Sequence, residues 1–359
     1  MMTTSLPTLL AAATGVTAHI FLFRRGEWDV ASPSILGSYA MIFALAMFST
    51  QFYLDVPPSV VAQLGGWHAA GLYLSMLLYR AFFHRLAGYP GPFLARLTNF
   101  YITALSIKKL HLFEEVQKLH AQYGDYVRLG PRELSIADPE AVKAIYGTQS
   151  PTTKGPWYTL LEPRVPVFMA RDKQEHAHRR KIWDKGFTTK ALLGYDPRIT
   201  TAINNLLAVI DRQKGQPLDV SQWFAFLVFD VMEDLAFNKS SNMLLNGKES
   251  YIFKMIRTDM YNIAFFTHLP WLLPFLKRTP ILNRDYLEFL DWIQRPYACV
   301  GKRLALLEIR RVVAEILSRY DVTIAPGQTK GAFLDGKQDT FTTVSASLPV
   351  IFTERVKAK

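Results

Sequence analysis

The sequence predicts a mainly helical protein with small β-sheets, carried on membrane-spanning helices at its N-terminal end. Three observations predict this class. The first eighty residues hold three long apolar stretches, helical periodicity dominates the middle of the chain, and short alternating stretches precede and follow it. Of the 359 residues, 50% are hydrophobic and only 20% are charged, which excludes general disorder and allows a large core.

The apolar stretches near the N-terminal end predict a membrane anchor. Each is about as long as the roughly 20 apolar residues that cross a bilayer core as a helix. Gln63 and His68 interrupt the third stretch, which leaves open that it is a buried or re-entrant helix and that fewer spans hold the body. No basic residue precedes the first stretch, so we expect an anchor and not a cleaved leader. The stretches cover residues 6–23, 35–54 and 60–79.

Positive charges flank these stretches on alternate sides. Arg24 and Arg25 follow the first, whereas the loop 55–59 contains no lysine or arginine, and Arg80 and Arg85 follow the third. Because basic residues collect on the cytosolic side of a membrane, we expect three transmembrane helices with a lumenal N-terminus. The body would then face the cytosol at the membrane of the endoplasmic reticulum.

A Gly-Tyr-Pro-Gly-Pro run at 88–92 predicts the domain boundary, because prolines stiffen the backbone and glycines reverse it. We therefore assign 1–85 to the anchor and 86–359 to the body. The elements expected in the body are a helix over 113–123, two strands over 126–136, a helix from Pro139 capped by Asp138, helices across most of 174–293, strands over 322–325 and 341–352, and a loop over 327–336.

The formal charge of +11 is typical of proteins that bind nucleic acid, but no recognition motif accompanies it. Most of the excess lies beyond residue 85, which suits a body beside an anionic membrane leaflet or an acidic partner. We therefore expect membrane lipid as a partner and no nucleic acid.

The single cysteine, Cys299, excludes an intramolecular disulfide and any site built from several thiolates of this chain. A lone cysteine is most often a small buried hydrophobe. This one, however, precedes a predicted helix, where the helix dipole and unpaired amides favour the thiolate. We interpret it as a ligand or a nucleophile. The helix is expected to place Leu306, Ile309, Val313 and Ile316 on one face, opposite Glu308, Arg311, Glu315 and Ser318.

Five residues around this cysteine have a defined spacing: Cys299, Gly301, Leu304, Ala305 and Glu308. The segment resembles the cysteine loop of the cytochrome P450 family, the heme-thiolate monooxygenases. In that family the cysteine is the axial ligand of the heme iron. The resemblance implies heme b as cofactor and Cys299 as the iron ligand. Gly301 leaves room where a side chain would meet the macrocycle.

Further stretches resemble the membrane-bound fungal form of the same family, in the expected order along most of the chain from Gly88 onward. They imply a P450-like fold for the body. The stretches are Pro90-Gly91-Pro92, Tyr123-Gly124, Val127-Arg128, Gly130-Pro131 with Leu134, Asp138-Pro139, Lys154 to Tyr158, Phe229 to Met232, Leu235 to Phe237, and Asp339 with Phe341-Thr342.

A basic cluster over 176–183 fits the same family. His176 and Arg180 lie one helical turn apart, so both side chains can reach a pair of carboxylates. The alternative is a solvated basic face. By resemblance we assign His176 and Arg180 to the heme propionates and leave Arg179 and Lys181 as surface charge.

Parts of the family pattern are missing. The acid-Thr pair of the central helix is absent, because Thr200-Thr201 lacks the required neighbours, so no catalytic residue is assigned. A Glu-x-x-Arg motif occurs only at Glu308 to Arg311. Because it follows the cysteine, it is not the Glu-x-x-Arg helix of the family, which precedes the cysteine. Arg295 stands where the family has glycine. We therefore expect an internal deletion at 294/295 that removes the central and Glu-x-x-Arg helices.

These observations predict a membrane-bound monooxygenase that inserts one oxygen atom into an apolar organic substrate of secondary metabolism, impaired by the deletion. A NADPH-dependent reductase would supply electrons, and the aromatic tract 251–276 is either core or a pocket for the substrate. One alternative is a non-catalytic membrane protein derived from such an enzyme. Another is a hydrolase or transferase that uses Cys299 as nucleophile with His176 or His178.

Overall fold

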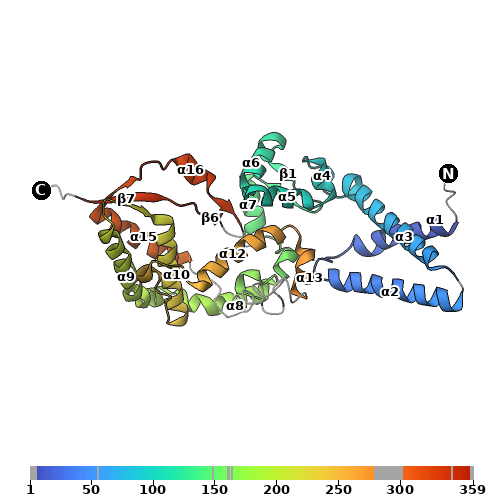
Figure 1. Ribbon diagram of the computed structural model, residues 1–359, viewed down its shortest axis with the longest axis horizontal. Coiled ribbons are helices and arrows are strands. Elements are labelled where there is room, and N and C mark those ends of the chain that lie inside the picture. Colours follow the sequence, from blue (N-terminus) through green and yellow to red (C-terminus); the bar gives the residue numbers. More distant parts are fainter. Residues whose placement is uncertain are drawn as a thin grey trace. The chain divides into compact units, whose positions relative to one another are not determined.

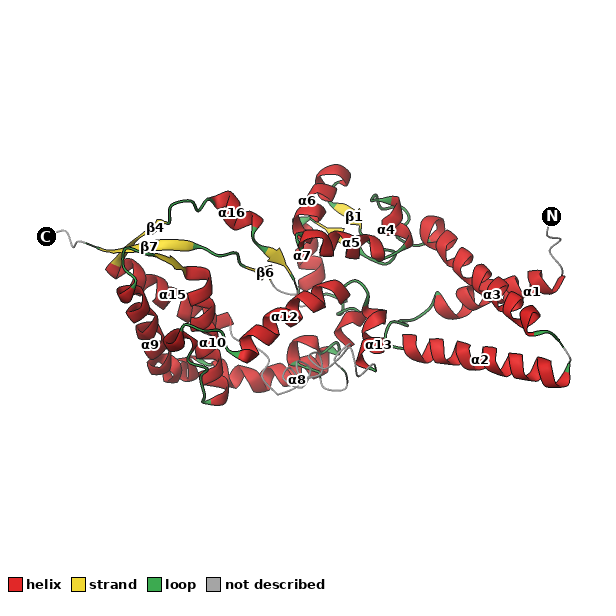
Figure 2. Ribbon diagram, in the orientation of Figure 1, coloured by secondary structure: helices red, strands yellow, loops and turns green. Residues whose placement is uncertain are grey.

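The structure is a computed structural model that describes residues 6–54, 56–147, 149–159, 162, 165–278, 302–340 and 343–355. The chain divides into two compact units. The first holds residues 1–160 and 265–284, and the second holds residues 161–264 and 285–359. Helices dominate both units and short antiparallel strands accompany them (Figure 2). The predicted class, mainly helical with small sheets, is confirmed.

Three long helices form the N-terminal part of the first unit, in blue in Figure 1. The helical stretches 6–23 and 32–53 are long and apolar enough to cross a membrane, a test that a buried core helix or a signal sequence also passes. The third predicted span is a helix of 21 residues that does not meet this criterion. The elements are α1 (Leu6–Ala18), the π-helical turn η1 (His19–Phe23), α2 (Ser32–Tyr53), α3 (Pro58–Leu78) and the π-helical turn η2 (Tyr79–Phe83).

The rest of the first unit packs short helices against a two-stranded hairpin. Ile102, Val127 and Leu129 form its buried centre. Both predicted strands form, and the side chain of Asp138 accepts a hydrogen bond from the backbone N–H of Glu140 at 2.9 Å, so the predicted hairpin and cap are confirmed. The elements are α4 (Phe93–Leu97), α5 (Phe100–Lys109), α6 (Leu112–Tyr123), β1 (Tyr126–Arg128), β2 (Leu134–Ile136), α7 (Pro139–Tyr146), η3 (Pro156–Thr159), η6 (Pro270–Leu272) and α13 (Leu273–Lys277).

The second unit is built around long amphipathic helices. Apolar residues recur at three- and four-residue spacing in each, so each helix turns one stripe toward a shared core. Ile203, Leu206 and Ile210 come from one of these helices, Phe226 from the next, and Ile316 from the helix that follows the cysteine. The helices are η4 (Val167–Met169), α8 (Lys173–Asp184), η5 (Lys185–Phe187), α9 (Thr189–Arg212), α10 (Val220–Phe237), α11 (Met243–Asn246), α12 (Tyr251–Phe266), α15 (Lys302–Arg319) and α16 (Lys330–Asp335).

A three-stranded antiparallel sheet closes the core of the second unit. Val350 and Phe352 of its central strand are buried and alternate with less buried neighbours. The strand over 217–219 was not predicted. The expected loop over 327–336 was wrong, because it contains α16, which Thr329 caps by accepting a hydrogen bond from the N–H of Ala332 at 3.0 Å. The strands are β3 (Pro217–Asp219), β7 (Pro349–Glu354) and β4 (Tyr320–Ile324) in this sheet, with β5 (Gln338–Asp339) and β6 (Thr343–Val344) in a separate pair.

Two buried acids on α10 hold the turn that leads into α11. Asp230, only 6% exposed, accepts hydrogen bonds from the backbone N–H groups of Met243 at 3.0 Å and Leu244 at 2.9 Å, and from the hydroxyl of Ser240 at 3.0 Å. Glu233 accepts one from a neighbouring N–H of the same turn. These carboxylates replace the water that the turn would otherwise need.

Candidate functional site

The predicted iron ligand Cys299 and its neighbour Gly301 lie outside the described residues, as does the predicted junction at 294/295. The described helix α15 begins at Lys302, three positions after the cysteine. The prediction that a long helix follows the cysteine is therefore confirmed. The roles of Cys299 and Gly301 stay predictions.

The predicted faces of α15 were wrong in part. Glu308, assigned to the polar face, is 8% exposed, and Val312 and Ile316 are buried beside it in the core of the second unit. Of the four residues expected on the buried face, Ile316 is buried, but Leu306, Ile309 and Val313 are exposed. Leu306, Ile309, Val313 and Leu317 are 42–59% exposed and form a second apolar stripe, which we call the open stripe of α15.

Arg311 fixes this rotation of α15. Its guanidinium forms an ion pair with Asp196 of α9 and donates a hydrogen bond to the hydroxyl of Thr200 at 3.0 Å. Both apolar stripes satisfy helical spacing, so the helix turns toward the face that gives Arg311 its carboxylate. The hydroxyls of Thr200 and Thr201 also donate to carbonyls one turn earlier in α9. The contacts that the structure describes for Arg311 are therefore with α9 and not with Glu308.

Burial raises the pKa of Glu308 to about 7 from a reference value of 4.5. Between these values the folded chain keeps a proton that the unfolded chain has lost, so stability falls as the pH rises through this window. Glu308→Gln should therefore leave stability unchanged near pH 4.5 and raise the free energy of unfolding by about 2 kcal/mol at pH 8. Urea unfolding of the full chain at both pH values measures this.

The control for that prediction is Glu315→Gln on the same helix. The side chain of Glu315 is 38% exposed and accepts a hydrogen bond from Arg319 at 2.9 Å, so its replacement should cost at most about 1 kcal/mol at pH 8. If Glu308→Gln lowered the free energy of unfolding at pH 8 by as much as Glu315→Gln does, the carboxylate of Glu308 would be paired and not merely buried.

The two predicted propionate ligands lie on α8, as expected. Asp172 caps this helix by accepting a hydrogen bond from the N–H of Glu175 at 2.7 Å. His176 is half-buried and Arg180 is exposed, and the Nε of Arg180 donates to Asp184 at 2.7 Å. The side chain of Arg180 is 47% exposed, so its partner is an exposed carboxylate that another carboxylate can replace.

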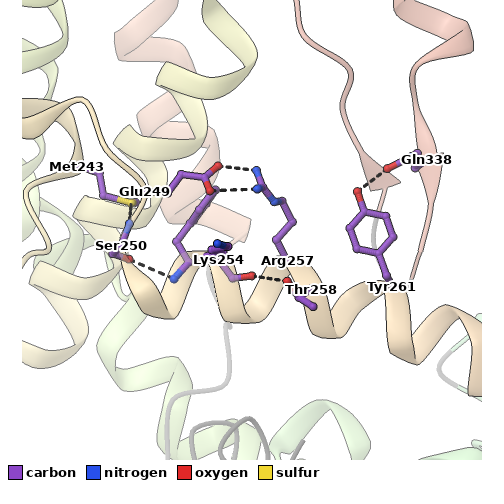
Figure 3. A network of polar contacts seen from close by, with 9 residues as sticks. Met243, Glu249, Ser250, Lys254, Arg257, Thr258, Tyr261 and Gln338 are labelled. Carbon is purple, nitrogen blue, oxygen red and sulfur yellow. Dashed lines mark hydrogen bonds and ion pairs between the residues drawn. The ribbon is translucent and has the colours of Figure 1, made fainter. Parts of the chain in front are cut away.

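The predicted pocket tract 251–276 contributes to the core over its first turns. Phe253 of α12 meets Phe226 and Phe229 edge-on, with ring centroids 5.9 and 5.2 Å apart. Figure 3 shows polar contacts along the same helix: Arg257 pairs with Glu249 through two nitrogen–oxygen contacts, and the hydroxyl of Tyr261 donates to Gln338 at 2.5 Å. These contacts tie α12 to its N-terminal turn and to β5. The first turns of the tract therefore stabilise the unit.

Among the described residues, no group of three or more histidine, cysteine, aspartate or glutamate side chains is arranged to hold a metal ion. A family model described as Cytochrome P450 matches residues 90–290, more than half of the chain. The chain belongs to the cytochrome P450 family. In this P450, the match to the family model ends at residue 290, four residues before the predicted junction at 294/295.

Relatives of this P450 are fungal monooxygenases. The chain is 41% identical over 358 positions to a cytochrome P450 monooxygenase of Fusarium pseudograminearum, covering 95% of this chain and 64% of the relative. It is 32% identical over 479 positions to a cytochrome P450 monooxygenase of Eupenicillium brefeldianum, covering 84% and 98%. It is 29% identical over 294 positions to the tryprostatin B 6-hydroxylase of Neosartorya fischeri, covering 79% and 53%. The chain therefore spans 64% and 53% of two of these relatives.

Cys299, His176 and Arg180 stay predicted site residues, whereas the burial of Glu308 and the structural role of Asp230 were not predicted from the sequence. The signal for Asp230 was present, since it lies among apolar residues in the middle of a helix. The signal for Glu308 was ambiguous, because two stripes of α15 are apolar.

Proposed function

We propose that this chain is a membrane-attached heme protein of the cytochrome P450 family whose chemistry is monooxygenation. The observation that carries the proposal is the family match over 90–290 together with the Cys299, Gly301, Leu304, Ala305 and Glu308 spacing that follows it. Heme with a thiolate ligand supplies the activation of dioxygen and the transfer of one oxygen atom to an organic substrate.

The residues present fit heme b. Cys299 provides the one soft ligand that the iron needs, and Gly301 leaves space beside it. On α8, Arg180 offers a guanidinium whose partner Asp184 is itself exposed, and His176 lies one turn away on the same helix. We assign Cys299 to the iron and His176 and Arg180 to the propionates. Charge-assisted hydrogen bonds of this kind orient the macrocycle.

We further propose that an internal block is missing at 294/295. The alignment with the Eupenicillium relative has 479 positions but uses 84% of the 359 residues, about 300, so roughly 180 positions meet no residue of this chain. That alignment reaches 98% of the relative, which supports a gap inside the chain. The open stripe of α15 supports the same proposal, because four exposed apolar side chains lie where a further element would pack.

The proposed partners follow from the family and the charge. A NADPH-dependent reductase would deliver electrons to the basic body, which lies on the cytosolic side of the endoplasmic reticulum membrane. The relative from Neosartorya fischeri is named for hydroxylation of an organic compound, which supports an apolar small molecule of secondary metabolism as the substrate. The missing block leaves the heme with less protein around it, so we expect weak retention and low turnover.

The reduced carbon-monoxide difference spectrum tests this proposal. Full-length chain is expressed in yeast microsomes with heme precursor supplied, and the spectrum is compared with microsomes that lack the chain. We expect a red-shifted Soret band of the thiolate type, at less than one heme per chain. A chain that stays colourless in excess heme contradicts the proposal and favours the non-catalytic membrane protein.

A further inference from the structure

Two polar residues of α3, His68 and Ser75, contact the other anchor helices, whereas Gln63 is exposed. His68 is hydrogen-bonded through Nδ1 to the hydroxyl of Thr14 at 2.9 Å and through Nε2 to the hydroxyl of Tyr39 at 3.3 Å. Ser75 is hydrogen-bonded to Nδ1 of His19 at 2.8 Å. His68 and Ser75 are two of the residues that make α3 less apolar than α1 and α2. Their polarity lies inside the group of helices, where hydrogen bonds between helices satisfy it.

Glycines bring α1 and α3 into close backbone contact. A Cβ atom on Gly15 would overlap the carbonyl oxygen of His68, and a Cβ atom on Gly71 would overlap that of Ala12. Gly15 and Gly71 are both buried. Small residues of this kind let two helices approach in a membrane, where apolar side chains alone give no preference for protein over lipid.

The contacts also give the direction of each helix. Along α1 and α3 the contacts advance together, from Ala12 with Gly71 to His19 with Ser75, so these two helices run parallel. Along α2 and α3 they run in opposite order: Tyr39 meets His68, whereas Phe43, later in α2, meets Gly65, earlier in α3. The chain therefore passes back and forth three times (Figure 1).

Both the α1–α2 loop and the end of α3 meet the first unit beyond the anchor. The hydroxyl of Ser32 at the start of α2 donates to the carbonyl of Trp271 at 2.5 Å. The carbonyl of Arg80 after α3 accepts a hydrogen bond from Arg128 at 3.0 Å. If α2 crosses a membrane away from this side, the chain must cross back to reach Arg80, and α3 is the described helix that lies between them in the sequence.

The outer surface of these helices is apolar. No described residue of α2 is buried, and its long side chains point outward as lipid-facing ones do. At 1.5 Å per residue the 21 residues of α3 are about 31 Å long, which matches the bilayer core. The large exposed side chains of α2 and α3 are Leu36, Met41, Ile42, Phe43, Leu45, Phe48, Phe52, Tyr53, Val60, Tyr73, Leu74, Leu77 and Leu78.

Cations mark one end of the same helices. Arg24 lies over the ring of Tyr79 at 4.8 Å, and Arg25 accepts a hydrogen bond at its carbonyl from the indole of Trp28 at 2.6 Å. Aromatic and basic residues together are typical of the membrane–water interface. Burial, with the charges of Arg128 and other arginines, lowers the pKa of His84 to about 4. The exposed cations at this end, Arg24, Arg25 and Arg85, carry fixed positive charge suited to anionic headgroups.

We propose that α3 is a third membrane span and that α1, α2 and α3 enter the bilayer as one bundle joined by the Gly15–Gly71 crossing and by His68. The partner of the outer surface is the lipid bilayer, and the loop 24–31 lies on the same side as residues 80–160. The inference rests on the membrane attachment proposed above and is independent of heme.

Single introduced cysteines test the crossings of α2 and α3. In the Cys299→Ser background, Val30→Cys, Val56→Cys and Gly88→Cys are expressed in sealed microsomes and exposed to a membrane-impermeant maleimide. Positions 30 and 88 should be labelled directly, and position 56 at least tenfold less until detergent opens the vesicles. Equal protection of positions 56 and 88 would overturn the proposal, as would labelling of all three. The carbon-monoxide spectrum of the unsubstituted chain, measured separately, reports on heme alone.

Two glycines of α3 test the packing. Gly71→Leu inserts a side chain into α1, whereas a Cβ atom on Gly66 would meet no atom within 4 Å, so Gly66→Leu is the control. Both changes raise helix propensity equally. Hydrogen exchange of the full chain in micelles should show amides of residues 8–20 exchanging at least tenfold faster in Gly71→Leu and unchanged in Gly66→Leu. The same exchange rate in both variants would overturn the proposed crossing.

Discussion

Cys299→Ser is expected to remove the thiolate-type band from the reduced carbon-monoxide spectrum completely. A serine hydroxyl is a poor ligand for ferrous heme, and this chain has no second cysteine to replace the lost sulfur. Heme that still binds should absorb at the shorter wavelength of complexes without a thiolate. The measurement compares the unsubstituted chain, Cys299→Ser and Ala298→Ser as a neighbouring control of similar size. A retained red-shifted band in Cys299→Ser would place the ligand elsewhere.

Substitutions in α8 test binding of the macrocycle separately from ligation of the iron. Arg180→Ala and His176→Ala should each raise the heme dissociation constant several-fold and leave the band position unchanged, because propionate contacts do not touch the iron. Lys181→Ala, a change of the adjacent surface charge, serves as the control. Unchanged heme affinity in both Arg180→Ala and His176→Ala would remove these residues from the site.

Asp230→Ala is expected to lower the free energy of unfolding by about 3 kcal/mol. The substitution leaves the N–H groups of Met243 and Leu244 and the hydroxyl of Ser240 without their acceptor, next to the core of the second unit. Each buried donor without a partner costs about 1–3 kcal/mol. Urea unfolding of the full chain, followed by circular dichroism, measures the change.

Asp234→Ala is the matched control for this prediction. It lies one turn further along α10, is a third exposed, and pairs with Arg198 at 2.7 Å. Loss of such a partly exposed ion pair should cost about 1 kcal/mol or less. Equal destabilisation by the two variants would show that Asp230 holds the turn no more strongly than a surface ion pair.

Local sequence patterns predicted the local parts of the fold. The Asp138-Pro139 pair specified the start of α7, and Gly130-Pro131 marked the turn between β1 and β2, because capping and turn chemistry involve only neighbouring residues. The mainly helical character also followed from periodicity. Such features need no partner from elsewhere in the chain.

Features that depend on distant partners were missed. Strand β3 exists because Leu218 pairs with Val350, more than a hundred residues away. The rotation of α15 depends on the ion pair between Arg311 and Asp196, which no pattern within α15 reveals. Glu308 is buried for the same reason. Tertiary contacts therefore decided between two apolar stripes that the sequence left equivalent.

The candidate site was predicted through resemblance more than through geometry. The cysteine spacing identified the family that the match over 90–290 shows. His176 and Arg180 were correctly placed on one helix, although the resemblance alone suggested what they bind. Cys299 itself lies outside the described residues, so its role stays a prediction.

The bond between the sulfur of Cys299 and a heme iron is most directly tested by iron X-ray absorption of the full chain reconstituted with heme. We expect one sulfur atom in the first coordination shell of the iron, and its loss in Cys299→Ser. A shell of nitrogen and oxygen atoms alone in the unsubstituted chain would contradict it.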